Sequence, residues 1–222
     1  MPTSIQAYVF DAYGTLFDVA SPVQRHAATL GAKAQTLATV WRDRQLQYTW
    51  LRSLQGRYVD FEQVTADALD HALEHIGAAD PDLRGRLLQA YATPRCYDEV
   101  GTTLRALRGR GLRTAILSNG TARWLDAAIH ANGLDDCFDA VLSVDALQVF
   151  KPHPSVYRCA ETALGLPAAA ISFQSSNGWD ACSAQAYGMR AVWCNRTGQT
   201  PERLSAPPAR VVSRLDELLD MA

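Results

Sequence analysis

The feature that most constrains the fold is a short apolar stretch near the start of the chain that ends in an aspartate. Residues 5–10 do not alternate strictly between apolar and polar side chains, which predicts a strand buried on both faces. The strand ends at Asp11, shortly before Gly14. Open α/β sheets bind ligands at the carboxyl ends of such strands, and a buried carboxylate there needs a cationic partner. On these residues alone, a turn-capping role explains Asp11 equally well.

The next part of the chain, residues 18–94, has no strand pattern. Ser21 and Pro22 predict a helix start, with the serine as cap and the proline in the first turn. Further helices are expected at residues 35–54, 61–76 and 82–92. Because this block follows one strand and precedes all the others, we expect an inserted all-helical cap domain, similar to a four-helix bundle, at residues 18–94.

Beyond residue 94, strands and helices alternate. Strands are expected at residues 113–117, 138–143, 170–174, 190–194 and 211–212. Helices are expected at residues 100–110, 121–132 and 154–164, between the strand at 170–174 and residue 187, and at the C-terminus. Such alternation predicts a parallel sheet with right-handed crossovers. The expected fold is therefore an α/β fold, a Rossmann-like, doubly wound core domain formed by residues 1–17 and 95–222, with the helical cap inserted.

Composition and charge narrow the function. The 222 residues carry a net charge of −2, so no basic surface predicts nucleic-acid binding. No apolar run is long enough to cross a bilayer, and the N-terminal residues lack the features of a signal peptide. The five cysteines are widely spaced and form no CxxC pair. This predicts free thiols in a cytoplasmic protein.

Polar residues gather at the predicted carboxyl ends of several strands. In a parallel sheet these ends share one edge, so side chains far apart in the sequence can meet there. One of the only two lysines in the chain lies in a loop on that edge. Capping alone does not explain so many convergent groups, which indicates a catalytic or binding site. These residues are Asp11, Ser118, Asn119, Lys151, Ser175, Asn177 and Asp180.

A competing motif lies in the helical block. His71, Glu74 and His75 match the HxxEH pattern of one class of zinc proteases, and histidines four residues apart can share a helix face. No third metal ligand is evident in the sequence, however. Histidines at the surface or at a subunit contact are the better interpretation.

With these residues in view, the chain resembles the haloacid dehalogenase superfamily and, within it, the L-2-haloacid dehalogenases of type II. The resemblance covers nearly the whole chain. The segments that carry it are DAYGTLFDV at residues 11–19, WRDRQLQYTWLRSL at 41–54, ILSNG at 116–120, FKP at 150–152, SSNGWD at 175–180 and NRTG at 195–198. The segment around Arg42 and the SSNGWD stretch are the most specific of these.

Two departures separate this chain from the phosphatases of the same superfamily. Those enzymes carry a second aspartate two positions after the nucleophile, where this chain has Tyr13. Their last motif has a Gly-Asp pair whose aspartate binds Mg²⁺, where this chain has Ser175 and Ser176. Dehalogenation is therefore the leading hypothesis. A phosphatase and a binding protein without turnover are the alternatives.

The resemblance implies a mechanism in which Asp11 attacks C2 of an L-2-haloacid, a small 2-haloalkanoic acid, and expels halide. Water then hydrolyses the aspartyl ester and releases a D-2-hydroxy acid. Lys151 would hold Asp11 ionised and orient it. Arg42 would receive the halide, although its own helix pattern alone would favour an exposed arginine.

The resemblance assigns roles to further residues and implies neither a metal nor an organic cofactor. Ser118 and Asn119 would bind the substrate carboxylate, and Asn119 could also contact the halide. Asp180, with Ser175 and Asn177, would position or activate water. The remaining expected roles are bracing of Asp11 by Thr15, support of Lys151 by Tyr157, and an apolar wall of Tyr13, Leu46, Phe61 and Trp179. A homodimer through the apolar helix at residues 35–54 is also expected.

Overall fold

The computed structural model describes residues 4–221, and its centre is a parallel sheet of six strands. The strand order is β3-β2-β1-β4-β5-β6, with every neighbouring pair parallel. The strands are β1 (Ala7–Phe10), β2 (Arg113–Ser118), β3 (Ala140–Ser143), β4 (Ile171–Ser175), β5 (Arg190–Cys194) and β6 (Arg210–Val212). β1 lies in the middle and is fully buried, as its apolar sequence predicts. The expected α/β fold is confirmed.

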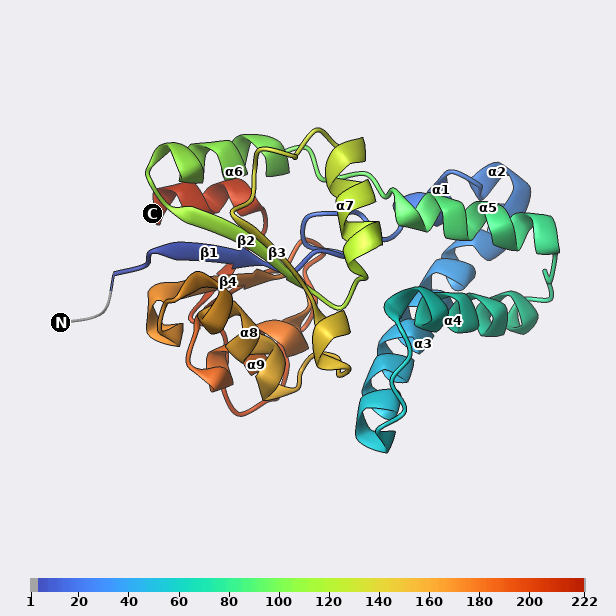
Figure 1. The fold of residues 1–222 in the computed structure, drawn as a ribbon. Helices are drawn as coiled ribbons and strands as arrows, with labels where there is room; N and C mark the ends of the chain where they lie inside the picture. Colours follow the sequence, from blue (N-terminus) through green and yellow to red (C-terminus); the bar gives the residue numbers. More distant parts are fainter. Residues whose placement is uncertain (1–3, 222) are drawn as a thin grey trace.

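Helices cover both faces of this sheet. Figure 1 shows α6 (Val100–Gly109) on one face, beside the C-terminal segment Leu215–Asp220. The other face is covered by α8 (Pro154–Leu164) and α9 (Gly178–Tyr187), and α7 (Ala122–Ala131) connects β2 to β3. The C-terminal helix that the sequence predicted is a 3₁₀-helix.

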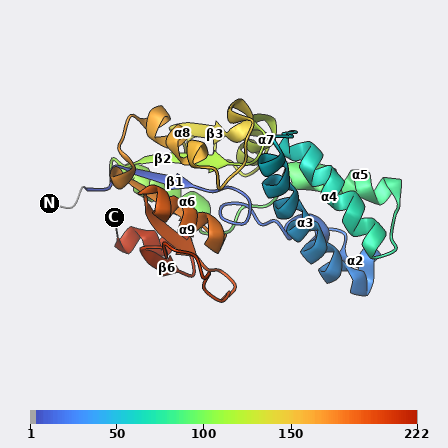
Figure 2. The ribbon, with the colours of Figure 1, turned by 90° about the horizontal axis from the view of Figure 1, so that it is seen from below.

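All the elements between β1 and β2, apart from α6, belong to a helical segment at residues 18–94. It contains α1 (Ser21–Gln24), α2 (Ala27–Leu30), a 3₁₀ turn (Gly31–Lys33), α3 (Ala34–Gln55), α4 (Phe61–His75) and α5 (Pro81–Ala92). Figures 1 and 2 show it to one side of the sheet, beyond the carboxyl end of β1. α3 packs along α4, and buried apolar side chains such as Leu37, Val64 and Leu69 form its core.

The ends of these helices follow local rules, with one exception. Asp60 caps α4 by accepting a hydrogen bond from Gln63 N at 2.8 Å, and Asp80 caps α5 in the same way. The prediction that Ser21 is the cap of the first helix was wrong. Ser21 is already helical and its hydroxyl donates to Asp18 O at 2.8 Å.

The chain enters and leaves the helical segment through two connections that lie side by side. Asp18 N donates to Arg95 O at 2.7 Å, and Tyr97 N donates to Leu16 O at 3.0 Å. Phe17 and Cys96 form an isolated antiparallel bridge between them. The two chain connections of the segment therefore lie together, close to Asp11, while side chains such as Tyr58 and Glu62 contact the rest of the chain elsewhere, at Asp145 and Thr121.

Candidate active site

Asp11 lies directly after β1, at the carboxyl edge of the sheet. Its backbone N–H donates to Gln174 O at 2.9 Å, which continues the pairing of β1 with β4, and its side chain is buried. The following loop then turns back through Gly14, whose φ of +95° favours glycine. This turn brings Thr15 back beside the Asp11 carboxylate.

Lys151 is the cation that the buried Asp11 requires. Its Nζ donates to Asp11 Oδ1 at 3.0 Å and to Asp180 Oδ2 at 2.8 Å, and its side chain is 1% exposed. Burial alone would lower the pKa of Lys151, but the two carboxylates outweigh it and raise that pKa above its usual value. Lys151 is therefore a charged group, as the sequence predicts.

The second oxygen of Asp11 accepts from neutral side chains. Thr15 Oγ1 and Asn177 Nδ2 each donate to Asp11 Oδ2 at 3.0 Å, while Ser175 Oγ lies at a longer 3.5 Å. Thr15 therefore contacts the carboxylate that it is expected to brace. Because all of these partners are fixed by the sheet edge, the carboxylate is oriented in advance rather than by a ligand.

Asp180 is fully buried on the far side of Lys151. Burial raises the pKa of Asp180, and contact with the Lys151 ammonium opposes that rise. Tyr157, which is expected to support Lys151, reaches it through Asp180. The Tyr157 hydroxyl donates to Asp180 Oδ1 at 2.7 Å, and Lys151 Nζ donates to the other oxygen of that carboxylate.

Arg42 reaches the site from α3. Its Nη2 donates to Tyr13 O at 3.3 Å and to Asn177 Oδ1 at 3.1 Å, which connects the helical segment to two strand ends. Its Nη1 donates to Gln45 Oε1 at 2.8 Å. The helix pattern alone would leave Arg42 exposed, whereas in the structure it is half-buried and lines the same cavity as Asp11.

Arg42 contacts a buried network of polar side chains, formed by Gln45, Thr65 and Tyr91, that was not predicted from the sequence. Gln45 Oε1 also accepts from the Tyr91 hydroxyl at 3.0 Å, and Gln45 Nε2 donates to Thr65 Oγ1 at 2.6 Å. All three side chains are buried. The sequence contains one indication of this network. Gln45 follows Arg42 by three residues, so the two side chains lie on the same face of the helix.

A small cavity of about 20 Å³ lies between Asp11 and the helical segment. Most of the predicted residues line it, while Thr15, Tyr157, Ser175 and Asp180 lie behind that lining. By volume it has room for about one water molecule. The lining residues are Asp11, Tyr13, Arg42, Leu46, Phe61, Ser118, Asn119, Lys151, Asn177 and Trp179.

Aromatic side chains close one wall of this cavity. Tyr13 packs against Phe61 and Tyr91, with ring centroids 5.5 and 5.4 Å away. The Tyr13 ring also passes so close to Gly120 that a Cβ there would lie 2.6 Å from it. Burial raises the pKa of Tyr13 well above its usual value, so its hydroxyl stays neutral. An aromatic residue thus fills the position of the second aspartate in phosphatases.

Donors at the end of β2 face the same cavity. Asn119 Oδ1 accepts from Lys151 N at 3.0 Å, which leaves the Asn119 Nδ2 end as the donor toward a ligand. Ser118 Oγ accepts from Gly120 N at 3.0 Å and is buried. With the Arg42 guanidinium, the Asn119 amide offers hydrogen-bond donors that suit an anion.

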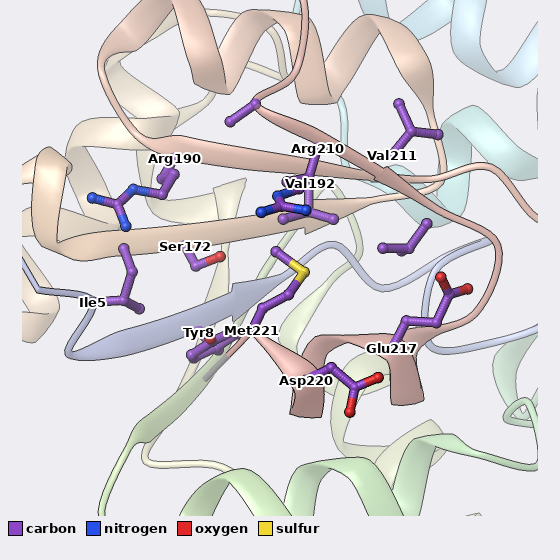
Figure 3. Close-up of a pocket in the computed structure, with 12 residues that line it drawn as sticks. Ile5, Tyr8, Ser172, Arg190, Val192, Arg210, Val211, Glu217, Asp220 and Met221 are labelled. Carbon is purple, nitrogen blue, oxygen red and sulfur yellow. The ribbon is translucent and has the colours of Figure 1, made fainter.

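Other parts of the described chain do not offer a comparable site. A larger cavity of about 660 Å³ lies at the amino ends of the strands, lined by Tyr8, Ser172 and Arg190 among others, and contains none of the predicted residues (Figure 3). Within residues 4–221, no three His, Cys, Asp or Glu side chains are placed to hold a metal ion. His71 instead accepts from Arg44 Nε at 3.1 Å. No helix among those residues is long and apolar enough to span a membrane.

Comparison with known proteins agrees with this geometry. Residues 5–188 match the family model of the haloacid dehalogenase-like hydrolases. The chain is 44% identical to an (S)-2-haloacid dehalogenase of Pseudomonas sp. (strain YL) over 98% of this chain and 94% of that protein. A solved L-2-haloacid dehalogenase is 43% identical, with a TM-score of 0.96 over 99% of each chain.

A second solved structure carries a ligand. It is the L-2-haloacid dehalogenase of Xanthobacter autotrophicus with chloropropionic acid covalently bound, 36% identical, with a TM-score of 0.91 over 98% of each chain. The resemblance that the sequence motifs suggested is therefore confirmed. The chain belongs to the haloacid dehalogenase-like hydrolases and, within them, to the L-2-haloacid dehalogenases.

Proposed function

We propose that this chain is an (S)-2-haloacid dehalogenase, a hydrolase that converts L-2-haloacids to D-2-hydroxy acids and halide. The observation that carries the proposal is the buried Asp11 carboxylate, held by Lys151 at 3.0 Å on a cavity wall opposite Arg42. A carboxylate paired with a buried ammonium and oriented in this way is a competent nucleophile toward carbon. The names of the relatives support the same reaction class.

In the first step, an Asp11 oxygen attacks C2 from the side opposite the halogen. The new C–O bond forms as the carbon–halogen bond breaks, halide leaves with the electron pair, and C2 is inverted. We assign the halide to the Arg42 guanidinium and the Asn119 amide. We assign the substrate carboxylate to Ser118 and to the backbone N–H groups of Asn119 and of the loop at Tyr13. The relative with covalently bound chloropropionic acid is a precedent for the ester.

In the second step, water attacks the carboxyl carbon of the ester, not C2. This restores Asp11 and releases the D-2-hydroxy acid, which retains the inverted configuration. We assign Asp180, with Ser175 and Asn177, to positioning or activating that water. Thr15 and Tyr157 act one step removed, since they hold the carboxylates of Asp11 and Asp180. The proposed steps use no metal and no organic cofactor.

We propose that residues 18–94 form a cap domain over a core of residues 1–17 and 95–222. Leu46 and Phe61 of the cap, with Tyr13 and Trp179, would cover the substrate alkyl group and exclude bulk water from the ester. The two chain connections lie side by side at Phe17 and Cys96, which supports this division because residues 18–94 then form one continuous insertion between β1 and the later strands.

A single-turnover reaction in ¹⁸O-labelled water tests the mechanism. Excess enzyme is mixed with L-2-chloropropionate, and the peptide containing Asp11 is weighed by mass spectrometry. We expect one labelled oxygen in Asp11 and unlabelled product; chloride release with unlabelled Asp11 would refute the ester. Asp11→Asn is the control variant. Mg²⁺-dependent phosphate release without chloride would favour the phosphatase alternative, and binding without turnover would favour a non-catalytic relative.

Two further expectations belong to this proposal. We propose a homodimer through α3, on which Leu51 is an exposed large apolar side chain outside the cavity at Asp11 and the neighbouring one. Sedimentation velocity at low protein concentration tests it, and a monomer mass would reject it. We also propose a cytoplasmic location, because all five cysteines are free thiols in the structure. Fractionation of the native cell tests the location.

A further inference from the structure

An apolar groove of about 450 Å³ lies beside the reaction cavity. Its walls come from four places in the chain, which are the end of α3, the loop before α8, the start of α9 and the loop after β5. The side chains that make it apolar are Trp50, Leu54, Phe150, Pro152, Trp179 and Leu204. The groove therefore lies between the helical segment and the sheet, as the reaction cavity does.

The groove and the reaction cavity adjoin. Lys151 and Trp179 line both of them, so these two side chains form the partition. The Trp179 ring meets the Trp50 ring edge to face, with centroids 5.3 Å apart. Both indole N–H groups are buried without a hydrogen-bond partner in the described structure, so packing rather than hydrogen bonding fixes these rings. A rotation of Trp179 would therefore break no hydrogen bond of its own.

The two spaces differ in size and in exposure. The reaction cavity holds about 20 Å³, which is about the volume of one water molecule, and Leu46 and Phe61 line its apolar side. The groove, in contrast, has an exposed rim, where Leu54 is 84% exposed and Leu204 50% exposed. Exposed large apolar side chains that border a groove indicate an apolar ligand.

We propose that this groove binds the alkyl tail of 2-haloalkanoic acids with about five or more carbon atoms. The carboxylate and C2 stay at Asp11, and the chain beyond C3 passes Trp179 and lies between Leu54 and Leu204. This inference rests on the proposed dehalogenase function and assigns a substrate class to the same site. Each methylene group that leaves water for the groove is expected to raise kcat/KM by up to about fourfold.

A chain-length series tests the proposal. Chloride release is measured with (S)-2-chloro acids from propionate to octanoate, for the wild type and for Leu204→Glu and Leu54→Glu. We expect both variants to lower kcat/KM for 2-chlorohexanoate by about tenfold or more, with 2-chloropropionate changed by less than about twofold. Val211→Glu is the matched control, because Val211 is 58% exposed on β6, does not line the groove and is not part of α3.

The outcomes separate this inference from the proposed function. If the wild type does not release chloride from 2-chloropropionate, the proposed function itself fails. If it does so but kcat/KM does not rise from 2-chloropropionate to 2-chlorohexanoate, the groove proposal alone is overturned. Equal losses on both substrates in Leu204→Glu and Leu54→Glu, together with a lower sedimenting mass, would make the groove a contact between two copies and also overturn it.

Discussion

Lys151→Met removes the ammonium group that contacts both buried carboxylates of the site. Methionine has a similar length and volume, so the change is mainly one of charge. Lys151 Nζ lies 3.0 Å from Asp11 Oδ1 and 2.8 Å from Asp180 Oδ2. Both carboxylates are buried, so water cannot solvate their charges once the ammonium group is removed. Both carboxylates then lie buried without a cationic partner.

The structure sets the size of the effect. Removing one partner of a buried ion pair costs about 3–5 kcal/mol of unfolding free energy. The donors that remain, Thr15 and Asn177 on Asp11 and Tyr157 on Asp180, favour the lower end of that range. Because burial already raises the pKa of Asp180, loss of the lysine raises it further. The cost is therefore full at alkaline pH, where Asp180 is charged, and shrinks as the pH falls and Asp180 takes up a proton.

Urea unfolding of the variant and the wild type at pH 8 and pH 5 measures this cost, and kcat/KM for L-2-chloropropionate measures the effect on chemistry. We expect a loss of about 3 kcal/mol at pH 8, a smaller loss at pH 5, and a fall in kcat/KM of about a thousandfold or more. Lys33→Met is the matched control, since Lys33 is the other lysine of the chain and is exposed. A variant as stable as the control at pH 8, or with more than about a tenth of wild-type activity, would refute the reasoning.

Two more predictions follow from the same contacts. Gln45→Leu removes the acceptor of the Arg42 Nη1 hydrogen bond, so we expect kcat/KM to fall by about tenfold. Gln45→Glu keeps an acceptor and should restore part of the activity. Wild-type activity in Gln45→Leu would contradict a role of Gln45 in positioning Arg42. In the pH profile of kcat/KM, we expect the acid limb above the ordinary aspartate range, because burial raises the pKa of Asp180. We expect activity to persist to about pH 10, because Asp11 and Asp180 raise the pKa of Lys151 despite its burial. An acid limb near the ordinary aspartate pKa would disprove this assignment.

Residues on the strand ends were predictable from the sequence alone. An apolar strand that stops at Asp11, and polar residues after three further strands, must meet at one edge once the sheet is parallel. The contacts of Asp11 with Lys151 and Asn177 follow this rule. Tyr157 does not, because its hydroxyl is delivered by α8 and could meet either Lys151 or Asp180 until the helix is packed.

The sequence by itself determined the α/β sheet, the helical insertion and the set of strand-end groups, because these follow from local apolar periodicity and from where strands stop. Only the tertiary structure decided that Arg42 turns inward, that Gln45 and Tyr91 fix it, and that an apolar groove borders the cavity. Those features arise where the helical segment packs against the sheet. Packing between segments distant in the chain leaves no periodic signal in either one, so a helix pattern cannot tell which charged residue faces a neighbouring domain.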